Sequence, residues 1–194
     1  MLRKYLLESM TQYELAHKTA QRNAALPIEQ GGLGLHSENT AHDRAKAMGF
    51  DTLAYHGTDN IFNKFDSKKI GANHIDSIDG GFFFSQNENT ASRYGKHVNQ
   101  FLLKKDNDYE IPTPIINHKF EDPNYPTKDY YNPIDTYDKN NADILHQVRF
   151  KDHTSITVKG FKNDNLSVMF KPHHIRSIHA AFDPMRKHES DLLA

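Results

Sequence analysis

Two short stretches decide the fold of this chain: Leu53-Ala54-Tyr55-His56-Gly57-Thr58 and Gly80-Gly81-Phe82-Phe83-Phe84-Ser85. The first places polar residues directly after an apolar run, which predicts hydrogen-bonding groups at the end of a buried strand. In the second, side chains alternate, so Phe83 and Ser85 face the side opposite to the other two phenylalanines. A hydrogen-bonding strand end beside an aromatic slot suits a flat ring with polar edges. We therefore expect a pocket for a nucleotide cofactor here.

The residues at the first strand end each have a chemical use. The imidazole of His56 can donate from one nitrogen and accept at the other, which suits a ribose hydroxyl. Gly57 has no Cβ, so its peptide groups can approach a carboxamide closely, and Thr58 caps the turn. Each residue also has an ordinary interpretation, because a strand-end histidine often bonds within the protein. Likewise, three consecutive phenylalanines are more often core than ligand site, and Tyr94 could simply pack.

The composition excludes several classes of protein. The 194 residues suffice for one domain with a proper core and a small helical appendage. A formal net charge of −1 gives no electrostatic case for binding nucleic acid or an anionic membrane. There is no cysteine, and the thirteen histidines lack the spacing of a metal-binding helix, so we expect no metal site. No apolar run approaches the roughly 20 residues that span a bilayer, so we expect a cytoplasmic protein.

The first part of the chain is expected to be a helical extension over residues 1–48. Apolar residues recur at helical spacing over 2–24 and again over 38–48. Asn39 or Ser37 is the expected cap of the second helix, and Gly49 its stop. These helices either cover the main domain or bind a partner.

The main domain is expected to cover residues 49–194. Short strands mixed with short helices, without a regular βαβ alternation, indicate the α+β class. The stretch 105–138 is rich in proline and tyrosine, so most of it should be irregular. Strands are expected at 53–56, 82–85, 99–104, 155–158, 166–170 and 175–181, and helices at 88–94 and 140–150.

Together these segments resemble the ADP-ribosyltransferase fold family, in its clan with a His-Tyr-Glu-type signature. His56-Gly57-Thr58 matches the first part of that signature. Gly81 to Ser85 matches its second strand, with Phe83 where the tyrosine usually stands, and Tyr94 matches a second stacking tyrosine. The chain is most similar to the branch found in polyvalent proteins of phages and prophages. That similarity rests on Leu26-Pro27, Gly31-Gly32-Leu33, Asn39-Thr40-Ala41, Arg44-Ala45, Met48-Gly49-Phe50, Phe62-x-x-Phe65-Asp66, the run from Val168 to Ser177, and the ending from Ala180 to Ala194.

The resemblance implies a split core of two small, mostly antiparallel sheets that bind NAD⁺ as co-substrate, without metal. It implies His56, Phe83 and Tyr94 as catalytic residues. The residues implied to contact NAD⁺ are His56, Gly57, Thr58, Gly81, Phe83, Phe84, Ser85 and Tyr94. Lys68, Lys69 and the loop to Gly80 would lie over the pyrophosphate.

The implied activity is transfer of one ADP-ribose from NAD⁺ to a protein side chain, with arginine as one candidate acceptor. The implied partner is the protein to be modified, which is a host protein if the chain is delivered into a host cytoplasm. One position departs from the family, because Leu166 stands where a glutamate or glutamine is usual. Three outcomes stay open: transfer with another carboxylate as base, Asp164 being nearest; slow NAD⁺ hydrolysis; or NAD⁺ binding alone. Modification of nucleic acid is less favoured, given the absent basic surplus.

Overall fold

The computed structural model describes residues 2–69, 81–111, 152–161 and 164–194. Side chains are described for 11–68, 81–110, 152–159 and 164–194. The expected helix at 140–150, the loop 70–80 and the proline-rich stretch after Ile111 lie outside the described residues. The predictions made for those segments therefore stay predictions.

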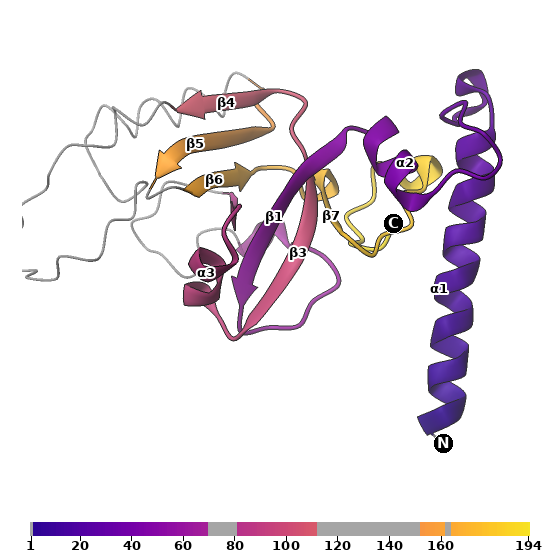
Figure 1. Cartoon of the computed structure of the whole chain (residues 1–194), viewed down its shortest axis with the longest axis horizontal. Helices are drawn as coiled ribbons and strands as arrows, with labels where there is room; N and C mark the ends of the chain where they lie inside the picture. Colours follow the sequence, from indigo (N-terminus) through magenta and orange to yellow (C-terminus); the bar gives the residue numbers. More distant parts are fainter. Residues whose placement is uncertain (1, 70–80, 112–151, 162–163) are drawn as a thin grey trace, which may run out of the picture.

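The described strands form one seven-stranded sheet with the order β4-β5-β6-β2-β1-β3-β7 (Figure 1). All neighbouring strands are antiparallel except β4 and β5, which are parallel. The strands are β1 (Phe50–Thr58), β2 (Phe82–Ser85), β3 (His97–Lys104), β4 (Asp108–Ile111), β5 (Ser155–Phe161), β6 (Asp164–Met169) and β7 (Ile175–Ser177). The α-helices are α1 (Leu2–Ala25), α2 (Ala41–Ala47) and α3 (Glu88–Ala91). The α+β class expected from the sequence is confirmed.

The expectation of two separate sheets is not confirmed, because the strands connect into one. The connection is narrow, however. Between β1 and β2 the ladder consists of the single pair Tyr55–Ser85, whereas β1 and β3 share eight pairs. Figure 1 shows β1 and β3 crossing steeply past the nearly level β5 and β6. The sheet therefore has two halves, β4-β5-β6-β2 and β1-β3-β7, that meet at one residue pair and then diverge.

A core rich in phenylalanine lies on one face of this sheet. Alternation along β2 buries Phe82 and Phe84, as expected, and leaves Phe83 38% exposed on the other face. Phe65 arrives from the loop after β1 and packs against both buried rings. The full cluster contains Ala54, Phe65, Phe82, Phe84, Phe101, Leu103, Met169, Ile175 and Leu192. The loop after β1 is therefore anchored beneath the strand end that carries His56.

The expected cap of the second helix is wrong, because Thr40 caps α2. The Thr40 side chain accepts from the backbone N–H of Asp43, and the Asp43 carboxylate accepts from the Thr40 backbone N–H at 2.8 Å. This reciprocal pair is a capping box. Asn39 is instead buried and donates to two backbone carbonyls. Gly49 ends the segment with φ of 84°, as expected for a helix stop.

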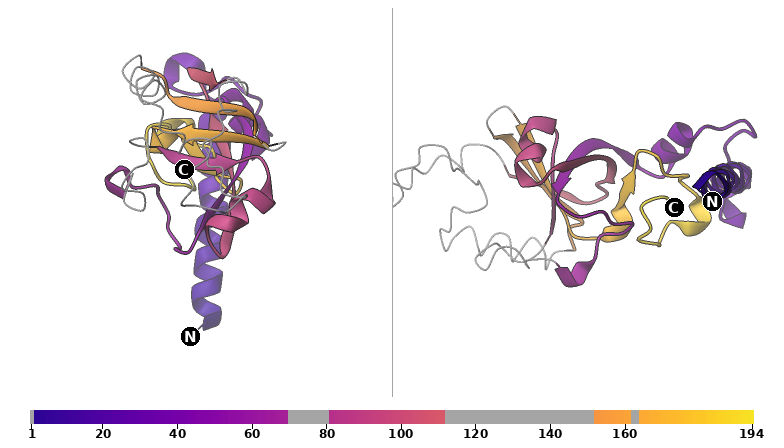
Figure 2. Two further views of the ribbon diagram at one scale, coloured as in Figure 1. Left: turned by 90° about the vertical axis from the view of Figure 1, so that its left-hand side faces the viewer. Right: turned by 90° about the horizontal axis from the view of Figure 1, so that it is seen from below.

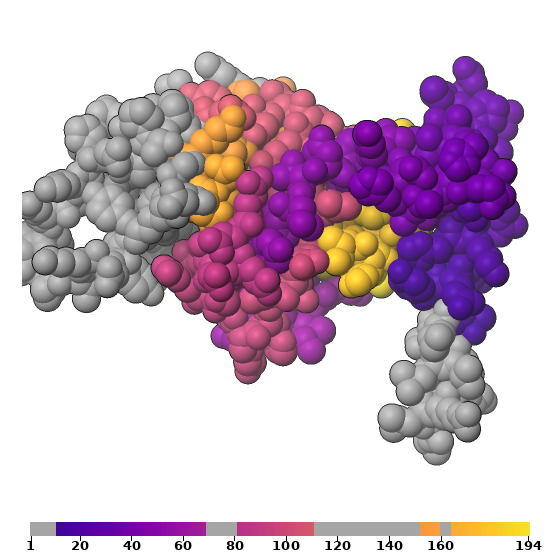
Figure 3. Space-filling model, viewed as in Figure 1, coloured from indigo at the N-terminus to yellow at the C-terminus, as the bar shows by residue number. Residues whose placement is uncertain are grey.

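The C-terminal residues are packed against the rest of the protein. Strand β7 ends at Ser177, earlier than the expected residue 181, because the chain turns and pairs with its own end. Ala181 N–H bonds to Leu193 O, and Phe182 N–H bonds to the carbonyl of Ala194. Figures 2 and 3 show this segment in yellow between the sheet and the N-terminal helices.

A second core joins α2 to that segment. Ala45 and Met48 pack with Phe50, Ala180 and Phe182. The buried Arg44 spans the same contact: its Nε donates to Ala181 O at 2.8 Å, and its Nη1 donates to Asn39. The helical segment therefore shares a core with the end of the chain. The division into parts 1–48 and 49–194 stays a prediction.

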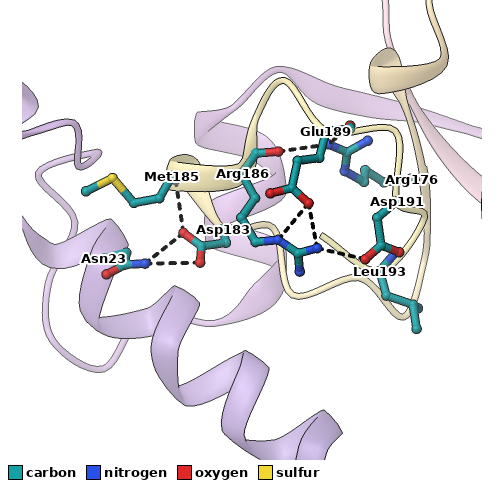
Figure 4. Close-up of polar contacts among 8 residues, drawn as sticks. All are labelled: Asn23, Arg176, Asp183, Met185, Arg186, Glu189, Asp191 and Leu193. Atoms are coloured by element: carbon teal, nitrogen blue, oxygen red, sulfur yellow. Dashed lines mark hydrogen bonds and ion pairs between the residues drawn. The ribbon is translucent and has the colours of Figure 1, made fainter.

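We call the residues Arg176, Arg186, Glu189 and Asp191 the C-terminal clasp (Figure 4). Arg186 pairs with both carboxylates, at 2.6 and 2.8 Å. Arg176 is fully buried, and its two terminal nitrogens donate to four backbone carbonyls, including Glu189 O at 2.8 Å. Burial lowers the pKa of Arg176 to about 10. The clasp holds the last turn of the chain against β7.

Helix α1 touches the rest of the protein through a short section. Ala20 and Ala24 are buried, and Asn23 donates to both oxygens of Asp183 (Figure 4). Figure 1 shows the first turns of α1 extending beyond the segment on which the helix packs. Within the described residues, none of the helices has the length and apolar character required to cross a bilayer.

Candidate active site at the join of the two half-sheets

His56 lies where β1 and β2 diverge. Its Nδ1 is 2.8 Å from the carbonyl oxygen of Phe83. The backbone pairing of β1 with β2 ends at Tyr55–Ser85, and beyond it this side-chain hydrogen bond connects the two strands. A carbonyl can only accept, so Nδ1 donates. In the neutral ring, Nε2 then carries the lone pair, and it makes no hydrogen bond to any residue that the structure describes. Nε2 can therefore accept from the hydroxyl of a ligand.

Aromatic rings hold the imidazole in this orientation. The centroid of the Phe65 ring lies 5.1 Å from that of His56, and the Phe84 ring 5.4 Å. Phe62 and Phe101 complete the surround at slightly longer distances. Burial lowers the pKa of His56 below its ordinary value of 6.5, although the bond to Phe83 opposes that shift. His56 is therefore neutral at physiological pH, with its tautomer fixed by Phe83.

Phe83 and Tyr94 approach this strand end from the β2 side and the α3 side. Both rings are exposed, Phe83 by 38% and Tyr94 by 62%, and each can present a face to a ligand. Tyr94 ends a 3-10 turn, Ser92–Tyr94, that follows α3. Its Cβ is 3.3 Å from the position that a Cβ on Gly57 would occupy. The structure thus brings the three segments of the expected site together.

Gly57 has a structural role that the sequence did not reveal. A Cβ at this position would lie 1.9 Å from the carbonyl oxygen of Ala91, so only glycine allows α3 to pack here. The β1–β2 ladder has ended before Gly57, so its edge toward β2 has no strand partner. That edge is where a carboxamide could bind.

Four other expected contact residues lie around this point in different roles. Thr58 Oγ1 accepts from Asn60 N–H, which makes it the cap of the turn. Gly81 allows β6 to approach, because a Cβ there would lie 2.1 Å from Val168 Cγ1. The Phe84 side chain is 2% exposed and belongs to the core beneath His56, and its contact with NAD⁺ stays a prediction. Ser85 is also buried, and its hydroxyl lies 2.5 Å from Asp164 Oδ2.

Leu166 lies on the face of the sheet that carries Phe83. It pairs with Ser85, and the next residue on the same face of β6, Val168, pairs with Phe83. Paired residues in antiparallel strands point to the same side. A glutamate at position 166 would therefore share a face with the Phe83 ring. The leucine offers no hydrogen bond there, which removes the usual third group of the signature.

Asp164 comes two residues earlier on the same face of β6. Asp164 is only 5% exposed. Its Oδ1 has no hydrogen-bond partner among the described residues. A hollow of about 410 Å³ lies next to it, lined by Tyr55, Gln86, Asn87, Glu88, Asp164 and Asn165. Sequence reasoning named Asp164 but not Tyr55 or Glu88. The alternation along β6 is the signal that places the carboxylate on this face.

Two further expectations concern the surroundings of the site. Lys68 lies in the 3-10 turn Ser67–Lys69, where its backbone N–H bonds to Asp66. The loop from there to Gly80 lies outside the described residues. In the part of the chain that the structure describes, no three histidine, aspartate or glutamate side chains gather as a metal site.

A protein-family model described as "ADP-Ribosyltransferase in polyvalent proteins" matches residues 47–182. This match covers more than half of the chain and includes His56, Phe83, Tyr94 and Leu166. The chain belongs to this family. ADP-ribosyltransferases use NAD⁺ as a substrate, and the resemblance drawn from the motifs is confirmed.

Solved structures add little to this assignment. The structure titled "Crystal structure of an anti-CRISPR protein" is similar over 61% of this chain and 89% of its own, at 13% identity and a TM-score of 0.33. A likeness this low carries no argument about function. No curated protein matches the chain.

Proposed function

We propose that this protein transfers a single ADP-ribose from NAD⁺ to a side chain of a target protein and releases nicotinamide. The observation that carries the proposal is the arrangement at the join of the half-sheets. There, a neutral His56 is fixed by Phe83 O and keeps Nε2 available, in a chain that belongs to an ADP-ribosyltransferase family.

In this proposal the exposed rings of Phe83 and Tyr94 enclose the nicotinamide, and the unpaired edge of Gly57 binds its carboxamide. His56 Nε2 accepts a hydrogen bond from a hydroxyl of the adjacent ribose. These contacts hold the nicotinamide–ribose bond at a fixed place in the cleft. Positioning of this kind supplies a large share of the rate in group transfer.

The reaction breaks the C1′–N bond of NAD⁺ through a transition state with positive charge on the ribose, as in glycoside hydrolysis. The departing nicotinamide takes the bonding electron pair and leaves neutral. A group that stabilises positive charge only at this stage accelerates the step. The family glutamate is placed for that task, and Leu166 cannot perform it. This residue is the reason to keep a second candidate.

The second candidate is a protein that binds NAD⁺ and hydrolyses it slowly or not at all. Leu166 favours this candidate, because a leucine and not a carboxylate stands opposite Ser85 on β6. Transfer to nucleic acid is a third and weaker candidate. The proposed target is a cytoplasmic protein, either of the producing cell or of a host that receives the chain.

Incubation of the full chain with biotinylated NAD⁺ and a cell lysate tests the proposal, together with an assay of released nicotinamide. A labelled protein band is expected from wild type and none from His56→Ala. Nicotinamide release without labelled protein would instead favour hydrolysis. Labelled nucleic acid would favour the third candidate, and neither label nor nicotinamide would leave NAD⁺ binding alone. Equal labelling by His56→Ala would reject the site.

A further inference from the structure

The hollow beside Asp164 has a lining that selects for the charge of its occupant. Two carboxylates, Asp164 and Glu88, face it together with the amide side chains of Gln86, Asn87 and Asn165 and the ring of Tyr55. No cationic side chain lines it among the described residues. A pyrophosphate would be repelled here, whereas a cation with several N–H donors would be attracted. The hollow is therefore separate in chemistry from the strand end around His56, which suits NAD⁺.

Asp164 is the feature that marks the hollow as more than an acidic surface. Its carboxylate is buried, at 5% exposure, and only Oδ2 is bonded, to Ser85 Oγ at 2.5 Å. Ser85 is held in turn by the backbone N–H of Asn87 at 2.9 Å. Oδ1 has no donor among the described residues. A buried acceptor without a donor is unfavourable, and a ligand with N–H groups would supply what is missing.

We propose that this hollow binds the guanidinium group of the acceptor arginine, with Asp164 as its main anchor and Tyr55 as a stacking wall. The proposal rests on the proposed function, since it assigns the acceptor subsite of the same reaction. The hollow shares a face of the sheet with Leu166, the position of the family glutamate. Asp164 lies two residues before Leu166, roughly 7 Å along β6, and Tyr55 pairs with Ser85, the partner of Leu166.

A guanidinium fits this lining better than an ammonium. Its planar array of donors can reach the Asp164 carboxylate and the neighbouring amide oxygens at the same time. Its flat face can also stack on an aromatic ring, which a lysine ammonium does less well. Glu88 is exposed at the rim and adds attraction for the approaching side chain.

Atoms and charges balance in the transfer. The C1′–N bond of NAD⁺ breaks and nicotinamide leaves with the electron pair. A nitrogen of the guanidinium forms the new bond to C1′ and loses one proton. The Asp164 carboxylate beside it is the group that takes this proton. No oxidant or metal is required.

Agmatine, which carries a guanidinium on a short chain, is the probe. Its affinity for the full chain is measured by calorimetry, without NAD⁺, for wild type, Asp164→Asn, Glu88→Gln and Asp51→Asn. Asp164→Asn should weaken agmatine binding by about tenfold, because a charge-assisted contact becomes a neutral one. Glu88→Gln, an exposed change that leaves the core intact, should weaken it by roughly threefold. Asp51→Asn is the matched control at the opposite end of β1, and it should bind as wild type does.

Three binding results would overturn the assignment. Unchanged agmatine affinity in both Asp164→Asn and Glu88→Gln would remove the hollow as the subsite, as would no binding to wild type. Cadaverine, with an ammonium in place of the guanidinium, should bind several-fold more weakly, and equal affinity would reject the guanidinium class.

Failure here and failure of the proposed function can be told apart. NAD⁺ affinity and nicotinamide release are measured on the same wild-type sample. If NAD⁺ is bound and cleaved while agmatine is ignored, only the acceptor assignment falls. If NAD⁺ is neither bound nor cleaved, the proposed function itself falls. Mass spectrometry of wild type with NAD⁺ and agmatine should show ADP-ribosylated agmatine, and its absence while nicotinamide is released counts against the subsite.

Discussion

The strand end around His56 and the C-terminal clasp around Arg176 both contain a buried cationic or titratable side chain, but they use it differently. The two terminal nitrogens of Arg176 donate hydrogen bonds to four backbone carbonyls of its own chain. Nδ1 of His56 donates to the carbonyl oxygen of Phe83, and Nε2 is available to a ligand. The terminal nitrogens of Arg176 are therefore satisfied within the protein, whereas His56 Nε2 has no hydrogen-bond partner among the described residues.

This difference divides the residues on which the family resemblance rested. Arg44 ties α2 to the C-terminal segment, and Arg176 ties that segment to β7, both through backbone carbonyls. His56, Phe83 and Tyr94 instead keep surfaces open at the join of the half-sheets. A motif residue whose side chain donates mainly to backbone carbonyls inside the protein indicates architecture. One with an unbonded nitrogen or an exposed ring is a candidate for contact with a ligand.

The largest effect is expected from Arg176→Ala in the clasp. It would leave four backbone carbonyls without their donor and remove a cation that lies 5.6 Å from the Phe50 ring centroid. We expect a loss of about 3–5 kcal/mol in the free energy of unfolding, measured by urea denaturation. NAD⁺ affinity of the folded fraction should stay near that of wild type. Arg186→Ala, which breaks partly exposed ion pairs, is the matched control and should cost under about 1 kcal/mol. A folded variant that has lost NAD⁺ affinity would break the comparison.

His56→Phe tests the strand end with the ring packing preserved. The substitution removes Nε2 and should lower the rate of nicotinamide release about 100-fold, or roughly 2.7 kcal/mol of transition-state stabilisation. His153→Phe is the matched control, because His153 Nδ1 also lies near a backbone carbonyl, that of Asn107, outside the site. The control should release nicotinamide at the wild-type rate. Equal loss in both variants would assign the effect to folding.

Gly57→Ala should affect both properties, because this glycine serves packing and binding together. Its added Cβ would overlap Ala91 O, so α3 must shift and carry Tyr94 with it. We expect about 1–3 kcal/mol of destabilisation and weaker NAD⁺ binding, measured on the same preparation by denaturation and calorimetry. Wild-type stability would show that α3 is not packed on the strand.

Much of the strand end could be predicted because alternation and motif spacing are local properties. β2 begins and ends where its sequence indicated, and Phe83 faces away from the core as expected. The contact of Phe84 with NAD⁺ stays a prediction, because its side chain lies in the core and no bound ligand tests its backbone. The His56–Phe83 bond could not be foreseen, since it depends on where two strands diverge in space.

The helix cap was missed for a related reason. Asn39 and Thr40 are both good capping residues, and their propensities alone do not separate them. The buried Arg44 decides between them, because it takes the side-chain oxygen of Asn39 at 2.9 Å. Thr40 is left to cap α2 together with Asp43. Tertiary contacts thus choose among residues that are locally equivalent.

Tyr94→Ala should have a moderate effect that is confined to the site. Loss of a stacking face should raise the KM for NAD⁺ by about three- to tenfold, in line with roughly 0.5–1.5 kcal/mol for an aromatic contact. The free energy of unfolding should change little, because the ring is 62% exposed. Tyr13→Ala, also an exposed tyrosine but on α1, is the control and should leave KM unchanged. An unchanged KM in Tyr94→Ala would mean that this ring does not touch NAD⁺.

The smallest effect concerns pH, and its direction follows from the lowered pKa of His56. The folded protein favours the neutral ring, so the contribution of this group to stability is complete above its unfolded value of 6.5. It is lost as pH falls below that value toward the lowered pKa. NAD⁺ affinity should likewise be constant from about pH 8 to 6.5 and decline only below, because protonation turns Nε2 from acceptor to donor. An NMR titration of the ring, identified by the signal missing in His56→Phe, checks this. A midpoint at or above 6.5 would show that the surrounding phenylalanine rings do not exclude water. His56 would then be as accessible to water as a histidine on the surface.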